Sequence, residues 1–128
     1  MRRAISVAVM VALIAAVWPK PREAHAVKEF MDQFKARYVD YESNDPARIR
    51  FAKRFEQTRC AVCHVKGEEK TVRTNYGRLL DKYLSKEQHK KDKAQILKVL
   101  RYVETQPSDP RDPRSATFGE RIKQGKLP

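Results

Sequence analysis

Two cysteines and a histidine lie within five consecutive positions near the middle of this 128-residue chain. Cys60 and Cys63 are its only cysteines, and His64 follows the second one directly, in the sequence TRCAVCHVKG. A disulfide, a metal site and a covalently attached haem would each explain this cluster. Each would impose a different fold on the rest of a small chain.

The first 26 residues have the pattern of a secretory signal peptide. Two arginines precede an apolar run of 15 residues, and the small-x-small sequence Ala24-His25-Ala26 follows a proline-containing segment. The run is short against the ~20 residues that cross a bilayer. We therefore expect cleavage after Ala26, an exported, periplasmic protein, and one domain formed by residues 27–128. After cleavage, no remaining segment is apolar enough to predict a membrane anchor.

In an exported protein, C-x-x-C-H is the attachment sequence of haem c. The two residues between the thiols set the separation needed to reach the two vinyl groups on one porphyrin edge. The residue after the second cysteine then lies under the iron, where an imidazole can bind as the proximal ligand. The motif predicts one haem c, linked covalently to Cys60 and Cys63, with its iron bound by His64.

Three other kinds of site use a similar pattern and stay open at this point. A thioredoxin-type redox pair also has the form C-x-x-C, but it follows a β-strand, and no strand pattern precedes Cys60. A zinc ion usually has four protein ligands, and the chain has no second C-x-x-C. A disulfide across two residues would restrain the unfolded chain very little.

The spacing of apolar residues predicts an all-α protein of four or five short helices, with no sheet. The first helix has about three turns and one apolar side, formed by Val27, Phe30, Met31, Phe34 and Tyr38. Each predicted helix has only three to five inward positions. A bundle of 102 residues would therefore be stabilised by a large apolar group at its centre, and a haem would be such a group.

Capping residues predict where the later helices begin. Asp45 and the proline after it start a helix that leads to the cysteines, and Thr74 is a candidate cap for the next one. Ser85, with a glutamine three residues later, predicts a further helix that continues to Glu104. A last short helix is expected at residues 118–123, before Gly125.

Removal of the predicted leader leaves a strongly basic chain. The sequence has 28 basic and 16 acidic residues, and the leader contains four of the basic and one of the acidic residues. The remaining chain therefore has 24 basic and 15 acidic residues, a formal charge of +9. Because an exported protein rarely meets DNA, this charge favours an acidic redox partner over nucleic acid. A solvated exterior would explain it equally well. We expect cations near the motif to surround the haem edge: Arg48, Arg50, Lys53, Arg54, Arg59 and Lys66.

The chain resembles small secreted monohaem c-type cytochromes. The likeness rests on the export signal, on CAVCH at residues 60–64 and on the helical pattern; RTNYGRLL and TFGERIKQGKLP are less specific segments that also resemble this group. The resemblance implies a cytochrome c-like bundle around one haem, thioether links at Cys60 and Cys63, iron ligation by His64, and one-electron transfer as the usual task. We expect an electron carrier and not an enzyme, with peroxidase-like or other haem catalysis left open.

The sequence departs from this family at the second axial ligand. Typical members supply a methionine from a loop well after the motif, and no methionine follows Met31 here. Met31, whose ordinary role would be core packing, and His89, which lies in the polar run KEQHKKDK, are the candidates. A lysine, a tyrosine, water or an open position are the remaining possibilities.

The sixth ligand decides between two functions. A strong ligand gives a closed iron suited to electron transfer, whereas an open position leaves room for a diatomic gas. We expect an exported carrier of single electrons between redox partners. The alternative is an open-site haem protein that binds or senses a small gas such as NO or CO.

Overall fold

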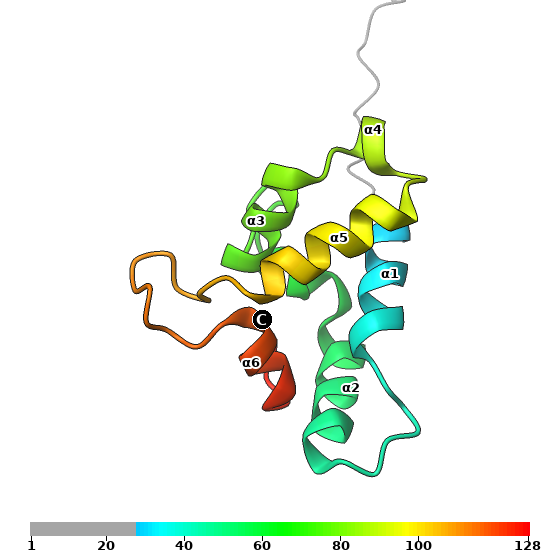
Figure 1. Ribbon diagram of the computed structural model, residues 1–128, viewed down its shortest axis with the longest axis vertical. Coiled ribbons are helices and arrows are strands. Elements are labelled where there is room, and N and C mark those ends of the chain that lie inside the picture. The colour runs from blue at the N-terminus through cyan, green and yellow to red at the C-terminus, as the bar shows by residue number, and fades with distance from the viewer. Residues whose placement is uncertain (1–27) are drawn as a thin grey trace, which may run out of the picture.

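The computed structural model describes residues 28–128. The predicted leader and Val27 lie outside the described residues. The described chain forms six α-helices and one short 3-10 helix (Figure 1): α1 (Lys28–Tyr38), α2 (Pro46–Thr58), η1 (Arg59–Val62), α3 (Asn75–Tyr83), α4 (Lys86–His89), α5 (Lys93–Glu104) and α6 (Phe118–Lys123). Between residues 28 and 128, β-structure is limited to two isolated bridges. The predicted all-α class is therefore confirmed.

Helix α5 lies at the centre of the arrangement (Figure 1). It packs against α1, α3, α4 and α6, while α2 packs against α6 and leads directly into η1. Four apolar side chains at helical spacing form its buried face: Ile96, Val99, Leu100 and Val103. Because such a face needs cover from several sides, the short helices around α5 share one core.

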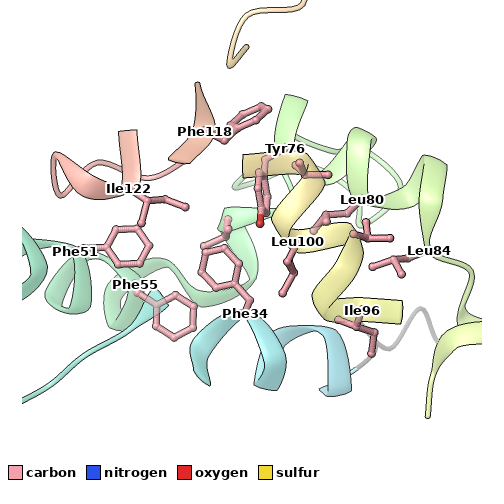
Figure 2. Packing of buried hydrophobic residues seen from close by; sticks show 13 residues of the cluster. Phe34, Phe51, Phe55, Tyr76, Leu80, Leu84, Ile96, Leu100, Phe118 and Ile122 are labelled. Atoms are coloured by element: carbon pink, nitrogen blue, oxygen red, sulfur yellow. The ribbon is translucent and has the colours of Figure 1, made fainter. Parts of the chain in front are cut away.

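Aromatic rings connect the other helices across this core (Figure 2). The ring of Phe34 on α1 stacks on Phe55 of α2, and its centroid also lies 5.7 Å from that of Tyr76 on α3. Tyr76 in turn meets Phe118 of α6 edge-on at 5.2 Å. Such ring pairs each contribute about 0.5–1.5 kcal/mol beyond the burial of their area. The contacts tie four helices to one another independently of α5.

The predicted capping residues begin their helices as expected. The carboxylate of Asp45 accepts a hydrogen bond from the Ala47 amide at 2.8 Å, and the hydroxyl of Thr74 accepts one from the Gly77 amide at 3.0 Å. Helix α6 has the predicted bounds, and Gly125 follows it with φ of 73°. Side chains that satisfy free amides at a helix start stabilise it by about 1 kcal/mol.

The segment predicted as one helix from Ser85 to Glu104 is divided in two. Helix α4 ends at His89, and α5 begins after Asp92, whose carboxylate accepts a hydrogen bond from the Gln95 amide at 2.9 Å. An aspartate at this position competes with the helical backbone for its amides and so favours a new helix start over continuation. This break raises the number of α-helices from the expected four or five to six.

A polar cluster fastens the end of α1 to the end of α5. Arg37 donates two hydrogen bonds to the Glu104 carboxylate, at 2.8 and 3.3 Å, and Tyr38 donates a third at 2.8 Å. Burial and the hydrogen bond to Glu104 raise the pKa of Tyr38 well above its ordinary value of 10.0. We call these three residues the α1–α5 clip.

Replacement of Tyr38 by phenylalanine should make the free energy of unfolding fall less steeply as the pH rises above about 10. The folded protein keeps the Tyr38 proton where the unfolded chain has lost it, so this contribution is complete below about pH 10 and declines above it. Denaturant unfolding at a series of pH values should show a shallower decline for Tyr38→Phe than for the parent. Tyr41→Phe is the control, because that ring is 53% exposed. Equal slopes for Tyr38→Phe and the parent would contradict the assignment.

Candidate functional site

The cysteine motif forms one tight turn after α2. The amides of Cys63 and His64 both donate to the carbonyl of Cys60, at 3.2 and 3.0 Å. Residues three and four positions apart lie on the same side of such a turn. The turn brings Cys63 and His64 to the lining of one cavity, described below, whereas Cys60 is exposed and does not line it.

The two thiols have different environments. Cys60 is exposed, Cys63 is partly buried, and both are free. Burial raises the pKa of Cys63 to about 12, against a smaller opposing effect of the Arg73 cation. Redox-active cysteines have a lowered pKa, because the thiolate is the reactive form. The environment of Cys63 is thus the opposite of that in a thioredoxin-type pair.

No group of three or more histidine, cysteine, aspartate or glutamate side chains in residues 28–128 is arranged to hold a metal ion. This includes the three side chains of the motif itself. A protein-only zinc site at Cys60, Cys63 and His64 therefore has no support in the described geometry.

A cavity of about 220 Å³ lies beside the motif and is lined by Cys63 and His64. Its walls come from three parts of the chain that are distant in sequence. One wall includes Phe34 of α1, and another includes Leu80 and Leu84. Figure 2 shows these three side chains pointing into the shared core. The apolar lining consists of Phe30, Met31, Phe34, Val62, Leu80 and Leu84.

His64 lines this cavity, and one nitrogen of its imidazole is unsatisfied. Its Nδ1 atom is buried and has no hydrogen-bond partner among the described residues. A buried polar atom without a partner costs about 1–3 kcal/mol. An imidazole, one neighbouring thiol and apolar walls are part of what a covalent haem needs, but the second thiol, that of Cys60, does not line the cavity.

Helix α3 packs directly on the cysteine motif through Gly77. A Cβ atom at this position would lie 2.0 Å from the Cys63 carbonyl oxygen, far inside contact distance, so only glycine permits this approach. Thr74 completes the attachment: its amide donates to the Cys63 carbonyl at 3.0 Å and its hydroxyl to the Val62 carbonyl at 2.8 Å. We call these contacts the Thr74–Gly77 junction.

Charged side chains form one edge of the cavity. Lys70 and Lys86 are exposed there, and Arg73 forms an ion pair with Asp81 at 3.0 Å. A bridge between His64 and Arg73 closes the loop that carries Lys70. We call Lys70, Arg73 and Lys86 the basic rim.

None of the six cations expected around the haem edge lines the cavity. Two of them pair with nearby acids: Arg48 with Asp40 at 3.3 Å and Arg59 with Glu56 at 2.7 Å. They precede or follow the motif in sequence, but most belong to the exposed side of α2. The rim that the structure shows comes instead from the loop after the motif and from the start of α4.

The two candidate distal ligands are placed differently. Met31 lines the cavity together with His64. His89 does not line it, and its Nδ1 atom accepts a hydrogen bond from the Ser85 amide at 2.9 Å, which completes the capping of α4. The polar surroundings noted in the sequence thus correspond to a local structural role for His89.

The cavity is smaller than a porphyrin requires. Pockets for drug-sized ligands have about 300–1,000 Å³, and this one has about 220 Å³. Its walls must therefore separate to take a haem.

Sequence reasoning missed the junction and the basic rim. Gly77 had a detectable signal, because a glycine inside an amphipathic helix costs about 1 kcal/mol relative to alanine and usually has a packing reason. The rim had none, since Lys70 and Lys86 lie in polar segments where exposed lysines are ordinary.

Comparison with models of protein families, with curated proteins and with solved structures gave no significant match. In the described part of the chain, no helix is both long and apolar enough to cross a membrane.

Gly77→Ala should displace the motif and destabilise the protein. Alanine would ordinarily stabilise a helix by about 1 kcal/mol, but here its methyl group would collide with the Cys63 carbonyl, and such overpacking costs about 1–3 kcal/mol or more. Urea unfolding should show a lower midpoint. Arg78→Ala, an exposed change at the next position of α3, should leave the midpoint nearly unchanged. A Gly77→Ala variant as stable as the parent would refute the close contact.

Proposed function

We propose that this chain is an exported c-type cytochrome that carries one electron between redox partners. In this proposal Cys60 and Cys63 hold one haem c through thioether links, and His64 binds its iron. The observation that carries it is that Cys63 and His64 of the motif line one cavity whose lining is largely apolar. The likeness of the motif region to small secreted cytochromes supports the same assignment.

The residues around the cavity have separate tasks in this function. A bound haem supplies reversible one-electron exchange at its iron. The apolar side chains of α1 and α3 exclude water and so influence the reduction potential. The basic rim offers cations for carboxylates at the haem edge, where charge-assisted hydrogen bonds are strong. The Thr74–Gly77 junction fixes the motif against α3 and thereby orients the imidazole.

The basic rim also supports an acidic partner. Lys70 and Lys86 are exposed at the cavity edge, and no ion pair involves them among the described residues. Cations at the edge where electrons leave would steer a negatively charged protein to this face. The predicted leader is consistent with an encounter outside the cytoplasm.

Covalent haem is the direct test of this function. Protein made in a host that matures c-type cytochromes should, after denaturation, have the mass of residues 27–128 plus one haem, with a low-spin absorption spectrum. Loss of either thiol, in Cys60→Ser or Cys63→Ser, should remove one thioether link and make the attachment incomplete, and His64→Ala should abolish the parental spectrum. Lys66→Ala is the control and should retain both the complete haem attachment and the parental spectrum. A mass without added haem would refute the function.

Electron transfer to an acidic redox protein should slow as ionic strength rises, because screening shortens the reach of the rim charges to about 10 Å at 0.1 M salt. Stopped-flow measurement of the second-order rate should show this dependence, and the double variant Lys70→Glu, Lys86→Glu should weaken it strongly. Lys123→Glu with Lys126→Glu, the same change in net charge on and after α6, should weaken it less. A rate independent of salt in the parent would rule out steering.

A further inference from the structure

We propose that Tyr83 and Tyr102 form an oxidative cross-linking site, at which a carbon–carbon bond between the two rings joins α3 to α5. The oxidant is a one-electron oxidant of the class that a peroxidase produces from hydrogen peroxide. Neither tyrosine lines the cavity beside the cysteine motif, so the site does not depend on whether the chain carries a haem. The observation that carries the proposal is the geometry of the two rings.

The two rings are in direct contact, and their hydroxyl groups lie together. The ring centroids are 5.1 Å apart at an interplanar angle of 79°, and the two hydroxyl oxygens are 3.5 Å apart. Hydroxyl groups that lie this close bring the neighbouring ortho carbons to the facing edges of the rings. Those ortho carbons carry much of the unpaired electron density of a tyrosyl radical, and they are the atoms that couple in dityrosine. A bond between them therefore needs only a small approach of the rings.

The backbone under each ring is held by the core. Tyr83 is the last residue of α3 and Tyr102 lies in the last turn of α5, and these two helices pack against each other (Figure 1). One turn before each tyrosine is a buried side chain, Leu80 on α3 and Val99 on α5. Because the rings are kept side by side, their coupling is intramolecular and has a high effective concentration. Coupling between two separate chains should be much rarer in dilute protein.

A diffusing oxidant can reach this pair from solvent. Tyr102 is 46% exposed, and Tyr83 is partly exposed. The hydrogen bond between the two hydroxyl groups lowers the pKa of Tyr83 and raises the pKa of Tyr102. Since oxidation of a phenol to its radical requires loss of the hydroxyl proton, Tyr83 is the ring that is oxidised more readily.

Among residues 28–128, the other three tyrosines do not combine exposure with a second phenol. Tyr76 is fully buried, at 0% exposure. Tyr38 donates its hydroxyl hydrogen bond to Glu104 in the α1–α5 clip. Tyr41 is 53% exposed, but its hydroxyl donates to Glu56. Tyr41 is therefore an exposed tyrosine without a coupling partner, and it serves as the control below.

The reaction is a two-electron oxidation that balances with one molecule of hydrogen peroxide. Each ring loses one electron and its hydroxyl proton and becomes a phenoxyl radical. The two radicals couple through one ortho carbon of each ring, and the hydrogen on each of these carbons then moves as a proton to the phenol oxygen. Both hydroxyl groups are thereby restored. The peroxide takes up the two electrons and two protons and becomes two molecules of water.

The cross-link closes a loop that contains α4 and Lys86 of the basic rim. Helix α4 (Lys86–His89) has no buried residue, so the fold itself restrains it weakly. A covalent bond between the helices on either side restrains the unfolded chain, and it also keeps the ends of this loop together. The cross-linked protein should therefore resist denaturant better than the parent.

Treatment of the full chain with peroxidase and hydrogen peroxide tests the site. The parent should lose the mass of two hydrogen atoms without forming dimers, gain the blue fluorescence of dityrosine and unfold at a higher urea midpoint. Trypsin cleaves before each tyrosine, so the bond should appear as a link between the peptides 83–86 and 102–111. Tyr83→Phe and Tyr102→Phe should each abolish the mass loss, and Tyr41→Phe, the matched control, should retain it.

Several results would overturn the proposal: an unmodified parent, links only between separate chains, oxygen added to single tyrosines without a link, or a mass loss that persists in Tyr83→Phe. The peptide map of the parent needs no variant, so it decides the matter even if a phenylalanine variant fails to fold. Each mass is compared with that of the untreated sample. The result is therefore independent of the proposed cytochrome function.

Discussion

The close approach of α3 to the cysteine motif is the contact on which the rest of the site depends. The turn at residues 60–64 is too short to bury itself, and its carbonyl groups need partners. Thr74 supplies two hydrogen bonds to this turn, and Gly77 lets the backbone of α3 come within contact distance of Cys63. Because α3 is itself held by α5 and by the Tyr76 ring, the position of the imidazole is fixed by the whole core.

Elements whose boundaries are encoded locally could be predicted from sequence. Asp45 and Thr74 accept hydrogen bonds from amides only two or three residues away. The residues that predict these helix starts are therefore all close together in the sequence. The interpretation of residues 85–104 as one helix was wrong for a related reason. Asp92 lies among lysines that are good helix formers, and only its bond to the Gln95 amide reveals that it starts a new helix. A capping residue inside a segment of good helix formers cannot be distinguished in the sequence from an ordinary polar residue. The backbone conformation is needed to identify it.

The candidate site was predictable only in its local part. The motif occupies five neighbouring positions, and its chemistry can be inferred from their spacing. The cavity, by contrast, combines Met31 on α1 with Leu84 after α3, more than 50 positions away, and periodicity shows which side of each helix is inward without showing which helices meet. The six cations expected around the haem edge illustrate the difference. Arg48 and Arg59 are close to the motif in sequence, yet each has its own acid partner away from the cavity.

The size of the cavity would link the proposed haem attachment to the stability of the fold. Its apolar walls enclose about 220 Å³, less than a porphyrin needs, and Phe30 and Met31 are only partly buried against the core. A large apolar group between them would bury those side chains further, at about 25 cal/mol for each Å² removed from water. Since a covalently held group cannot dissociate, this gain would belong permanently to the folded state.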